Sequence, residues 1–544
     1  MSTLKRNTTR RNPTTTDKTF AEAVMGEKKL NKNTAVCGAI FALYALLTLI
    51  GALNHELWYD EAQAWTIARD NTIGGIFHQL GYEGHPPLWY LILYVFAHTG
   101  FECTVIPIVS WVITASAAAV VMFKSPFHAA IKAALLFSGG FLFYNSVMSR
   151  VYCLINLMVV LTAWLYPKRK ARPILFGILI ALLANTHICI SGFIGIMGIF
   201  MITDLLGGFR TNTAKQNAAE ITGLAISGAG VLLMVIPLLN SLSLNASTAK
   251  VNYTFEFVVG AILDSFSNIS MALIAYENKN LFLFFVSGII AVLLVAEFIL
   301  IRHKTRPFLI LVFFTVFYII TSGIFWYTIP NRAHIFVLMF FVTAWIADCE
   351  PQNGAGKIWT KVSFKSDTKA IENIIGFIRK LDSNYMRCFN IILTAVLVVS
   401  VPAGARFLFG DCIGSFSPSE HAAEYIKENF PENTVFVTDD EVAPFMAAYL
   451  PDYRFYSEDF GNFYTYNGHK NLPDKRPYER TYNDLKDCEN VYYMDVHVEI
   501  DFMPSNRKII YIIREGMPFG VNIRYIEISE FDLDREIKSY IDNV

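Results

Sequence analysis

The chain has 544 residues, of which 54% are hydrophobic and 17% are charged, and its formal net charge is −1. Soluble domains carry about 25% charged residues, so this deficit indicates a membrane protein. The small net charge excludes the strong overall field that attracts nucleic acid.

The N-terminal 35 residues are polar and basic and precede the first apolar run. No small-residue cleavage site follows that run, so we expect a cytoplasmic tail ahead of a retained helix. A spanning helix needs roughly 20 mostly apolar residues, and about eleven runs come close to this length. They lie at 36–53, 105–123, 131–147, 151–166, 173–190, 192–206, 221–239, 281–301, 307–327, 333–347 and 389–409.

Basic loops indicate how these runs are oriented, because Lys and Arg collect on the cytoplasmic side. The apolar segment 87–97 is about half a span long. If it makes no net crossing, every basic loop falls on the same side as the N-terminal tail; these loops are 123–132, 166–173, 207–216, 301–307 and 348–388. The polar motifs of residues 36–409 then share the outer face, together with the C-terminus.

Residues 410–544 differ in composition and predict a small extracytoplasmic α/β domain. Helices are expected at 417–430 and 441–450, and strands at 433–440, 452–459, 490–496, 508–515 and 523–529. No glycine-rich phosphate loop occurs there, so we expect no nucleotide site. The eight cysteines form no CxxC motif, and a disulfide between Cys412 and Cys488 remains an open alternative.

The first candidate functional residues are two adjacent acids, Asp60 and Glu61, which follow the first apolar run. One interpretation is that they are solvated charges favouring a helix N-terminus. The other is that one carboxylate is a general base whose pKa is tuned by its acidic neighbour. The flanking aromatic residues could then bind the faces of a sugar; these are Trp58, Tyr59 and Trp65.

Four further residues lie on the same expected outer face. His85 precedes two prolines that force an extended corner, and His187 lies at a helix end, where it is either a core residue or a ligand. Arg150 and Arg332 stand beside apolar runs, either as interfacial anchors or as a pair of guanidiniums that binds a phosphate. We expect no metal site, although Asp60, Glu61, His85 and His187 together offer ligands for a divalent cation.

The motifs "WYDEAQAW", "HPPLWYL", "SRVYCL" and "PNR" resemble the GT-C superfamily of polytopic glycosyltransferases over roughly residues 36–347. That superfamily includes protein mannosyltransferases, the aminoarabinose transferase of lipid A, and bacterial membrane proteins of unassigned substrate. The resemblance implies a GT-C membrane domain at 36–409, with a catalytic outer loop at 54–87. The C-terminal part also looks like the extracytoplasmic tail of such proteins.

The resemblance further implies transfer of a sugar from a polyprenyl-phosphate donor to a glycan, lipid or protein acceptor in the cell envelope. Asp60 matches the presumed base and Glu61 the second acid of the family loop. His85 stands where many relatives have lysine, and it would contact phosphate only when protonated, which is partly so at neutral pH. Arg150 and Arg332 would hold the lipid phosphate, and the absence of a facing second carboxylate favours inversion.

Two interpretations from other classes remain. A transporter or flippase would also need polar groups among apolar helices, although such proteins often show internal repeats and mid-membrane broken helices. We find no fixed repeat, and the polar motifs collect at one face, which favours the enzyme. A membrane-anchored receptor acting through residues 410–544 is the third interpretation.

Overall fold

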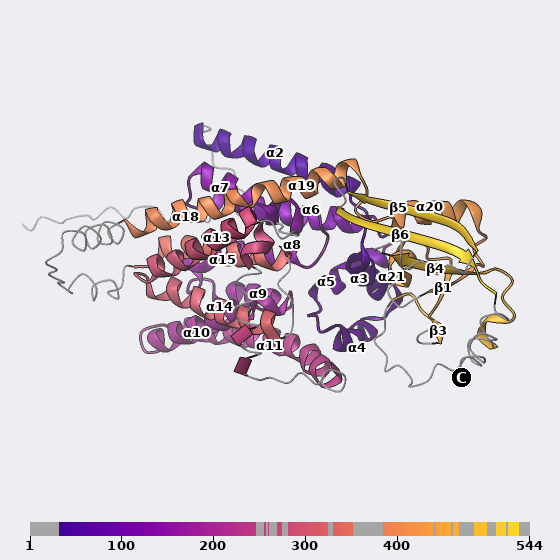
Figure 1. Cartoon of the computed structure of the whole chain (residues 1–544). Helices are drawn as coiled ribbons and strands as arrows, with labels where there is room; N and C mark the ends of the chain where they lie inside the picture. Colours follow the sequence, from indigo (N-terminus) through magenta and orange to yellow (C-terminus); the bar gives the residue numbers. More distant parts are fainter. Residues whose placement is uncertain are drawn as a thin grey trace, which may run out of the picture.

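The computed structural model describes residues 32–245, 255–256, 259–260, 269–274, 281–324, 330–351, 384–438, 442–457, 461–466, 483–497, 508–517 and 521–532. Most of the expected basic tail and of the 348–388 connector lies outside these residues. Figure 1 shows a helical bundle on one side and a sheet domain on the other. Three short helices lie between them: α3 (Tyr59–Asp70), α4 (Ile73–Glu83) and α5 (Leu88–Ala97).

Within the described residues, seven helical segments are long and apolar enough to cross a membrane. They involve α2 (Lys32–Asn54), α6 (Val105–Lys124), α10 (Ser191–Gly208), α11 (Ala214–Asn245), α13 (Leu281–Ile301), α15 (Pro330–Cys349) and the consecutive helices α18 (Tyr385–Val399) and α19 (Val401–Ile413). This finding supports a membrane-embedded helical protein, with fewer qualifying spans than the eleven runs in the sequence.

Three other expected spans correspond to apolar helices that do not meet the same length and hydropathy requirement. They are α8 (Tyr152–Leu165), α9 (Pro173–Ala184) and α14 (Thr305–Ile324). Helix α5 has ten residues, which confirms that the apolar segment 87–97 is a short helix. Its length, about 15 Å at 1.5 Å per residue, is half of a hydrocarbon core.

The expected continuous span at 131–147 is wrong. Helix α7 (Ala129–Leu136) is followed by a π-helical turn, η1 (Gly140–Tyr144). The two glycines at this turn lie close to α15: a Cβ atom on Gly139 would lie 2.7 Å from the His334 ring. At Gly140 it would lie 2.6 Å from the Cβ of His334. Hydropathy does not detect this steric requirement.

The chain after η1 leaves the helical pattern while buried, so its carbonyl groups need partners from neighbouring helices. The amide of Asn331 donates to the carbonyl oxygen of Tyr144 at 2.6 Å. The hydroxyl of Ser110 donates to the carbonyl oxygen of Ser146 at 2.8 Å. Irregular backbone is tolerated inside such a bundle when protein groups satisfy it. These contacts hold the segment that leads to Arg150.

Several of the basic loops meet at the far end of α15. Asp204 accepts from the guanidinium groups of Arg169 and Arg306, each at 2.7 Å. Glu350, directly after α15, accepts from the hydroxyl of Tyr166 at 2.7 Å. Loops that the charge pattern assigned to one side are therefore neighbours in space.

The C-terminal domain contains a six-stranded sheet in the order β3-β2-β1-β4-β6-β5. Strand β1 lies in the middle, parallel to both β2 and β4, and all four of its residues are buried. The helices and strands expected in this domain are confirmed, and β3 is added. They are α20 (Ser419–Asn429), β1 (Val435–Thr438), α21 (Val442–Tyr449), β2 (Arg454–Ser457), β3 (Asn462–Phe463), β4 (Val491–His497), β5 (Ile509–Met517) and β6 (Val521–Glu530).

The disulfide between Cys412 and Cys488, which the sequence left open, is not formed. Cys412 and Cys488 are both free thiols. Cys412 packs beside the apolar cluster at η1 and α19, whereas Cys488 packs beside the cluster under β1 and β4. Each behaves as a small hydrophobic residue, as a partly buried free cysteine usually does.

Candidate functional site

Helix α3 begins at Tyr59 because Glu61 caps it. The Oε2 atom of Glu61 accepts a hydrogen bond from the backbone nitrogen of Trp58 at 3.1 Å, which is one half of a capping box. Asp60 therefore lies in the first helical turn, where the helix dipole favours a carboxylate. Its side chain is 32% exposed, and its Oδ2 atom lies 2.6 Å from Nη1 of Arg150.

Arg150 is held between aromatic rings at the end of the irregular segment that follows η1. Its guanidinium lies 5.8 Å from the ring centroid of Trp58 and 5.5 Å from that of Tyr152. Burial disfavours its charge, but Asp60 outweighs that effect and raises the pKa of Arg150 above its ordinary value. Arg150 is thus a permanent cation that faces a partly exposed carboxylate.

A second guanidinium reaches the same cluster from α15. Nε of Arg332 donates to the hydroxyl of Tyr152 at 3.3 Å, and Arg332 is only 7% exposed. The ring of His187 lies 5.5 Å from the Tyr152 ring and 5.6 Å from the His85 ring. The structure therefore brings together residues that are far apart in sequence: Asp60, His85, Arg150, His187 and Arg332.

His85 is placed by the corner between α4 and α5. Gly84 ends α4 in the left-handed conformation (φ 66°), and Nδ1 of His85 donates to the carbonyl oxygen of Glu83 at 2.9 Å. Burial, followed by the charges of Arg150 and Arg332, lowers the pKa of His85 to about 4. This shift disfavours the protonated imidazole in the ligand-free protein, and contact between His85 and a phosphate stays a prediction.

Sequence reasoning missed Glu83. Its Oε1 atom accepts from the amide of Gln63 at 2.9 Å and from that of Gln79 at 3.3 Å. Burial raises the pKa of Glu83 to about 7, and the charge of Asp60 adds to the shift. A carboxyl group that titrates near neutrality is suited to proton transfer. In the sequence, Glu83 could have been noticed as an acidic residue two positions before His85.

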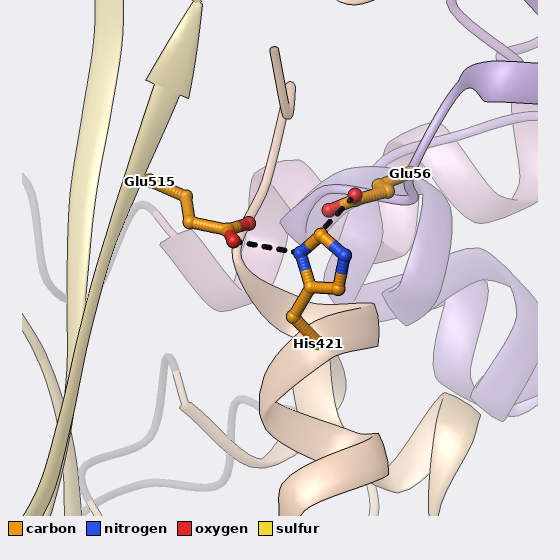
Figure 2. Close-up of side chains that lie close together, drawn as sticks. All are labelled: Glu56, His421 and Glu515. Atoms are coloured by element: carbon orange, nitrogen blue, oxygen red, sulfur yellow. Dashed lines mark ion pairs between the residues drawn. The ribbon is translucent and has the colours of Figure 1, made fainter.

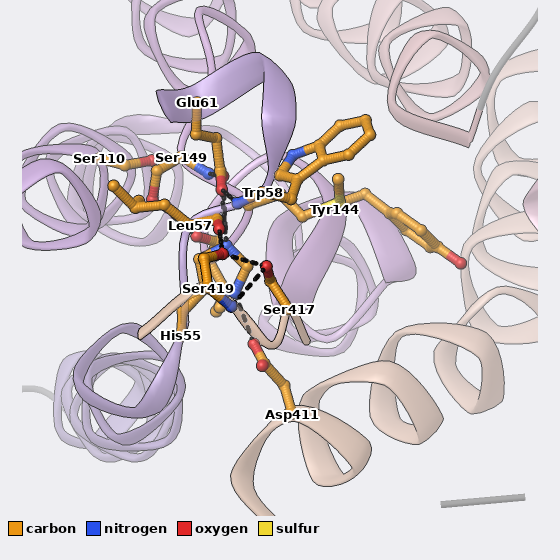
Figure 3. Close-up of polar contacts among 12 residues, drawn as sticks. His55, Leu57, Trp58, Glu61, Ser110, Tyr144, Ser149, Asp411, Ser417 and Ser419 are labelled. Atoms are coloured by element: carbon orange, nitrogen blue, oxygen red, sulfur yellow. Dashed lines mark hydrogen bonds and ion pairs between the residues drawn. The ribbon is translucent and has the colours of Figure 1, made fainter. Parts of the chain in front are cut away.

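Glu61 belongs to a different, fully buried network, shown in Figure 3. Its Oε1 atom accepts from the backbone nitrogen of Ser149, and its Oε2 atom lies 3.1 Å from Nε2 of His55. Nδ1 of His55 lies 2.7 Å from Oδ2 of Asp411 in α19. These contacts place Glu61 in a buried network that also holds the backbone of Ser149, next to Arg150.

Two of the three aromatic residues expected to bind sugar make contacts outside the cluster. The ring of Tyr59 packs against Phe445 of α21, with centroids 5.8 Å apart. Trp65 is 1% exposed and belongs to the core. Trp58 lies against Arg150, and sugar binding by these rings stays a prediction.

A cavity of about 530 Å³ lies between the C-terminal end of α3, helix α4 and strands β2 and β3. Gln79 lines this cavity and also donates to Glu83. The other lining residues are mostly aromatic or polar: Asp70, His78, Tyr82, Tyr453, Arg454, Phe455, Asn462, Phe463, Tyr464, Thr465 and Tyr466.

No model of a known protein family matches the chain, and no curated protein matches it either.

Proposed function

We propose that the chain is a membrane glycosyltransferase of GT-C type, which moves a sugar from a polyprenyl phosphate to an acceptor hydroxyl. The observation that carries this proposal is the ion pair of Asp60 and Arg150, with Arg332 next to it. A carboxylate can accept the proton of a hydroxyl, and paired guanidiniums suit the oxyanions of a phosphate. Both chemical requirements are met within one cluster.

In the proposed reaction, the acceptor oxygen attacks the anomeric carbon while its proton passes to Asp60. The bond between that carbon and the phosphate oxygen breaks, and its electron pair leaves with the lipid phosphate. Arg150 and Arg332 hold the phosphate charge. Because Arg150 pairs with Asp60 before substrate binds, an arriving phosphate competes for the guanidinium and frees a carboxylate oxygen for the acceptor.

A single displacement inverts the anomeric centre, since Asp60 acts as base rather than as nucleophile. Glu61 cannot serve as a second reacting acid, because it is buried against His55. We place the body of the acceptor in the cavity lined by Gln79, which donates to Glu83. The aromatic rings and polar groups of this cavity are the usual lining of a site that binds small polar molecules.

The proposed location is the cell membrane, with the N-terminus in the cytoplasm and the C-terminal domain outside. At 1.5 Å per residue, Arg332 and Glu350 at the two ends of α15 are roughly 27 Å apart. The candidate site surrounds the first end, and the basic loops cluster at the second. Basic loops favour the cytoplasmic side, which leaves the candidate site at the outer face.

Cysteine labelling of intact cells tests this orientation. In a Cys349→Ser background, which removes an exposed native thiol, we expect Glu102→Cys to react with an impermeant maleimide. Arg172→Cys should react only after the cells are opened. Both positions are exposed, so the opposite labelling pattern would overturn the proposed orientation.

Sugar transfer itself is tested with Arg332→Gln. Purified protein in liposomes is supplied with a radiolabelled polyprenyl-phosphate sugar and extracted envelope acceptors. Loss of a charge that stabilises the leaving phosphate should lower kcat by about 10²- to 10³-fold. Arg406→Gln, which removes an exposed arginine on α19, should retain the wild-type rate.

Normal transfer by Arg332→Gln would remove this residue from the phosphate site. Movement of the labelled lipid across the bilayer by the wild-type protein, without any transfer, would instead favour the flippase alternative.

A further inference from the structure

A second cluster of ionisable side chains lies outside the candidate site, where the C-terminal domain meets the loop after α2 (Figure 2). It consists of Glu56 in that loop, His421 on α20 and Glu515 on β5. Their nearest ligand atoms all lie within 4.8 Å of one another. Nδ1 of His421 is 2.7 Å from Oε1 of Glu515 and 3.9 Å from Oε1 of Glu56.

The ion pairs within this cluster leave some of its carboxylate oxygens without a hydrogen-bond donor. Two carboxylates face a single imidazole nitrogen, and Glu56 is only 7% exposed. Among the described residues, the Oε2 atoms of Glu56 and Glu515 are buried and have no hydrogen-bond partner. A buried carboxylate oxygen without a donor is costly. Burial accordingly raises the pKa of Glu56 to about 8, although His421 opposes the shift.

We propose that Glu56, His421 and Glu515 bind one divalent cation, with Zn²⁺ as the expected ion. One imidazole and two carboxylates form a mixed ligand set that suits Zn²⁺, and a water molecule would complete a tetrahedron. Ligand atoms around zinc lie about 3.4 Å apart when each bond is about 2.1 Å long. Small side-chain movements therefore suffice to close the site. His421 is 49% exposed, which leaves a path for the ion from solvent.

The cation would attach the C-terminal domain to the loop that precedes Asp60. That loop is already held by this domain at the next residue, since the backbone nitrogen of Leu57 donates to the hydroxyl of Tyr449 at 2.8 Å. Ser419 donates to the carbonyl oxygen of Leu57 at 2.9 Å. The proposed metal site is a further attachment at the same junction, and it stands whether or not the chain transfers sugar.

Metal analysis of the full-length protein in detergent tests the proposal. The protein is purified with a tag that contains no histidine, stripped with a chelator, and dialysed against buffered Zn²⁺ or Mn²⁺. We expect one Zn²⁺ per chain by mass spectrometry of the metal and a higher melting temperature than for the stripped protein. Glu515→Gln and His421→Ala should bind Zn²⁺ at least tenfold more weakly, whereas Glu428→Gln, an exposed acid on the same helix, should bind normally.

If Glu515→Gln or His421→Ala fails to fold, Glu56→Gln still tests whether this cluster binds the metal. It removes an incompletely paired buried acid, so the metal-free variant should melt no lower than the metal-free wild type while losing the ion. Equal zinc binding by wild type and Glu56→Gln would place the metal elsewhere, for example on free thiols. If the wild type binds neither Zn²⁺ nor Mn²⁺ stoichiometrically, the cluster is an ion pair only and the proposal fails.

Discussion

Replacing Asp60 with asparagine is expected to lower the rate of sugar transfer by about 10²- to 10⁴-fold, the usual contribution of a general base. Asparagine has nearly the same shape but cannot accept a proton from the acceptor hydroxyl. The KM for the lipid donor should stay the same or fall, because a negative charge beside the phosphate site is removed. A defect confined to kcat would separate the chemical step from donor binding.

The same variant should fold normally. Asparagine keeps an oxygen that can accept from Arg150, whose side chain is 13% exposed, so losing the charge is expected to cost about 1–3 kcal/mol of the free energy of unfolding. Glu102→Gln is the matched control, since it removes an exposed acid from the loop before α6. Transfer by Asp60→Asn at the wild-type rate would exclude Asp60 as the base, and Glu83 would become the next carboxylate to test.

Replacing His55 with glutamine is expected to destabilise the protein by about 3–5 kcal/mol. The imidazole lies between two buried carboxylates, 3.1 Å from Glu61 and 2.7 Å from Asp411. Removing it leaves both acids without their shared counter-ion. Chemical denaturation in detergent measures the loss, with His98→Gln, an exposed histidine after α5, as control. Equal stability of His55→Gln and wild type would contradict a charged network.

This network also predicts a pH dependence. Burial opposes the imidazolium, but Glu61 and Asp411 outweigh it and raise the pKa of His55 well above its ordinary value. A raised folded-state pKa contributes stability that is fully present below the unfolded value of about 6.5. The contribution is lost as the pH rises through the folded-state pKa of His55. Wild type should therefore lose stability on alkalinisation, and His55→Gln should lack that part of the slope.

Local patterns were sufficient to predict the C-terminal elements and the grouping of the candidate site. Strands β1 and β2 and helix α21 follow from short apolar runs bounded by turn residues, which do not depend on distant contacts. Asp60, Arg150 and Arg332 were grouped by loop charges alone, and the structure brings them into one cluster. The charge rule works here because it reports which ends of many helices share a side.

Long-range contacts explain what sequence reasoning missed. His55 and Asp411 are 356 residues apart, and nothing near either residue indicates the other. Glu83 ends an amphipathic helix, where an acid is usually solvated, and only the packing of Gln63 and Gln79 around it changes its chemistry. The end of α7 at Leu136 and the close approach of α15 to Gly139 and Gly140 are likewise not encoded in an apolar run.

The hydrogen bonds that hold Leu57 have a consequence for protein engineering. Both backbone groups of this residue are bound by side chains of the C-terminal domain, Tyr449 and Ser419. Arg69, at the other end of α3, donates to the carbonyl oxygen of Ala447 at 2.8 Å. The C-terminal domain therefore cannot be exchanged by itself. A chimaera that joins another protein's C-terminal domain to this helical bundle must also take that protein's counterparts of the loop before Asp60 and of helix α3.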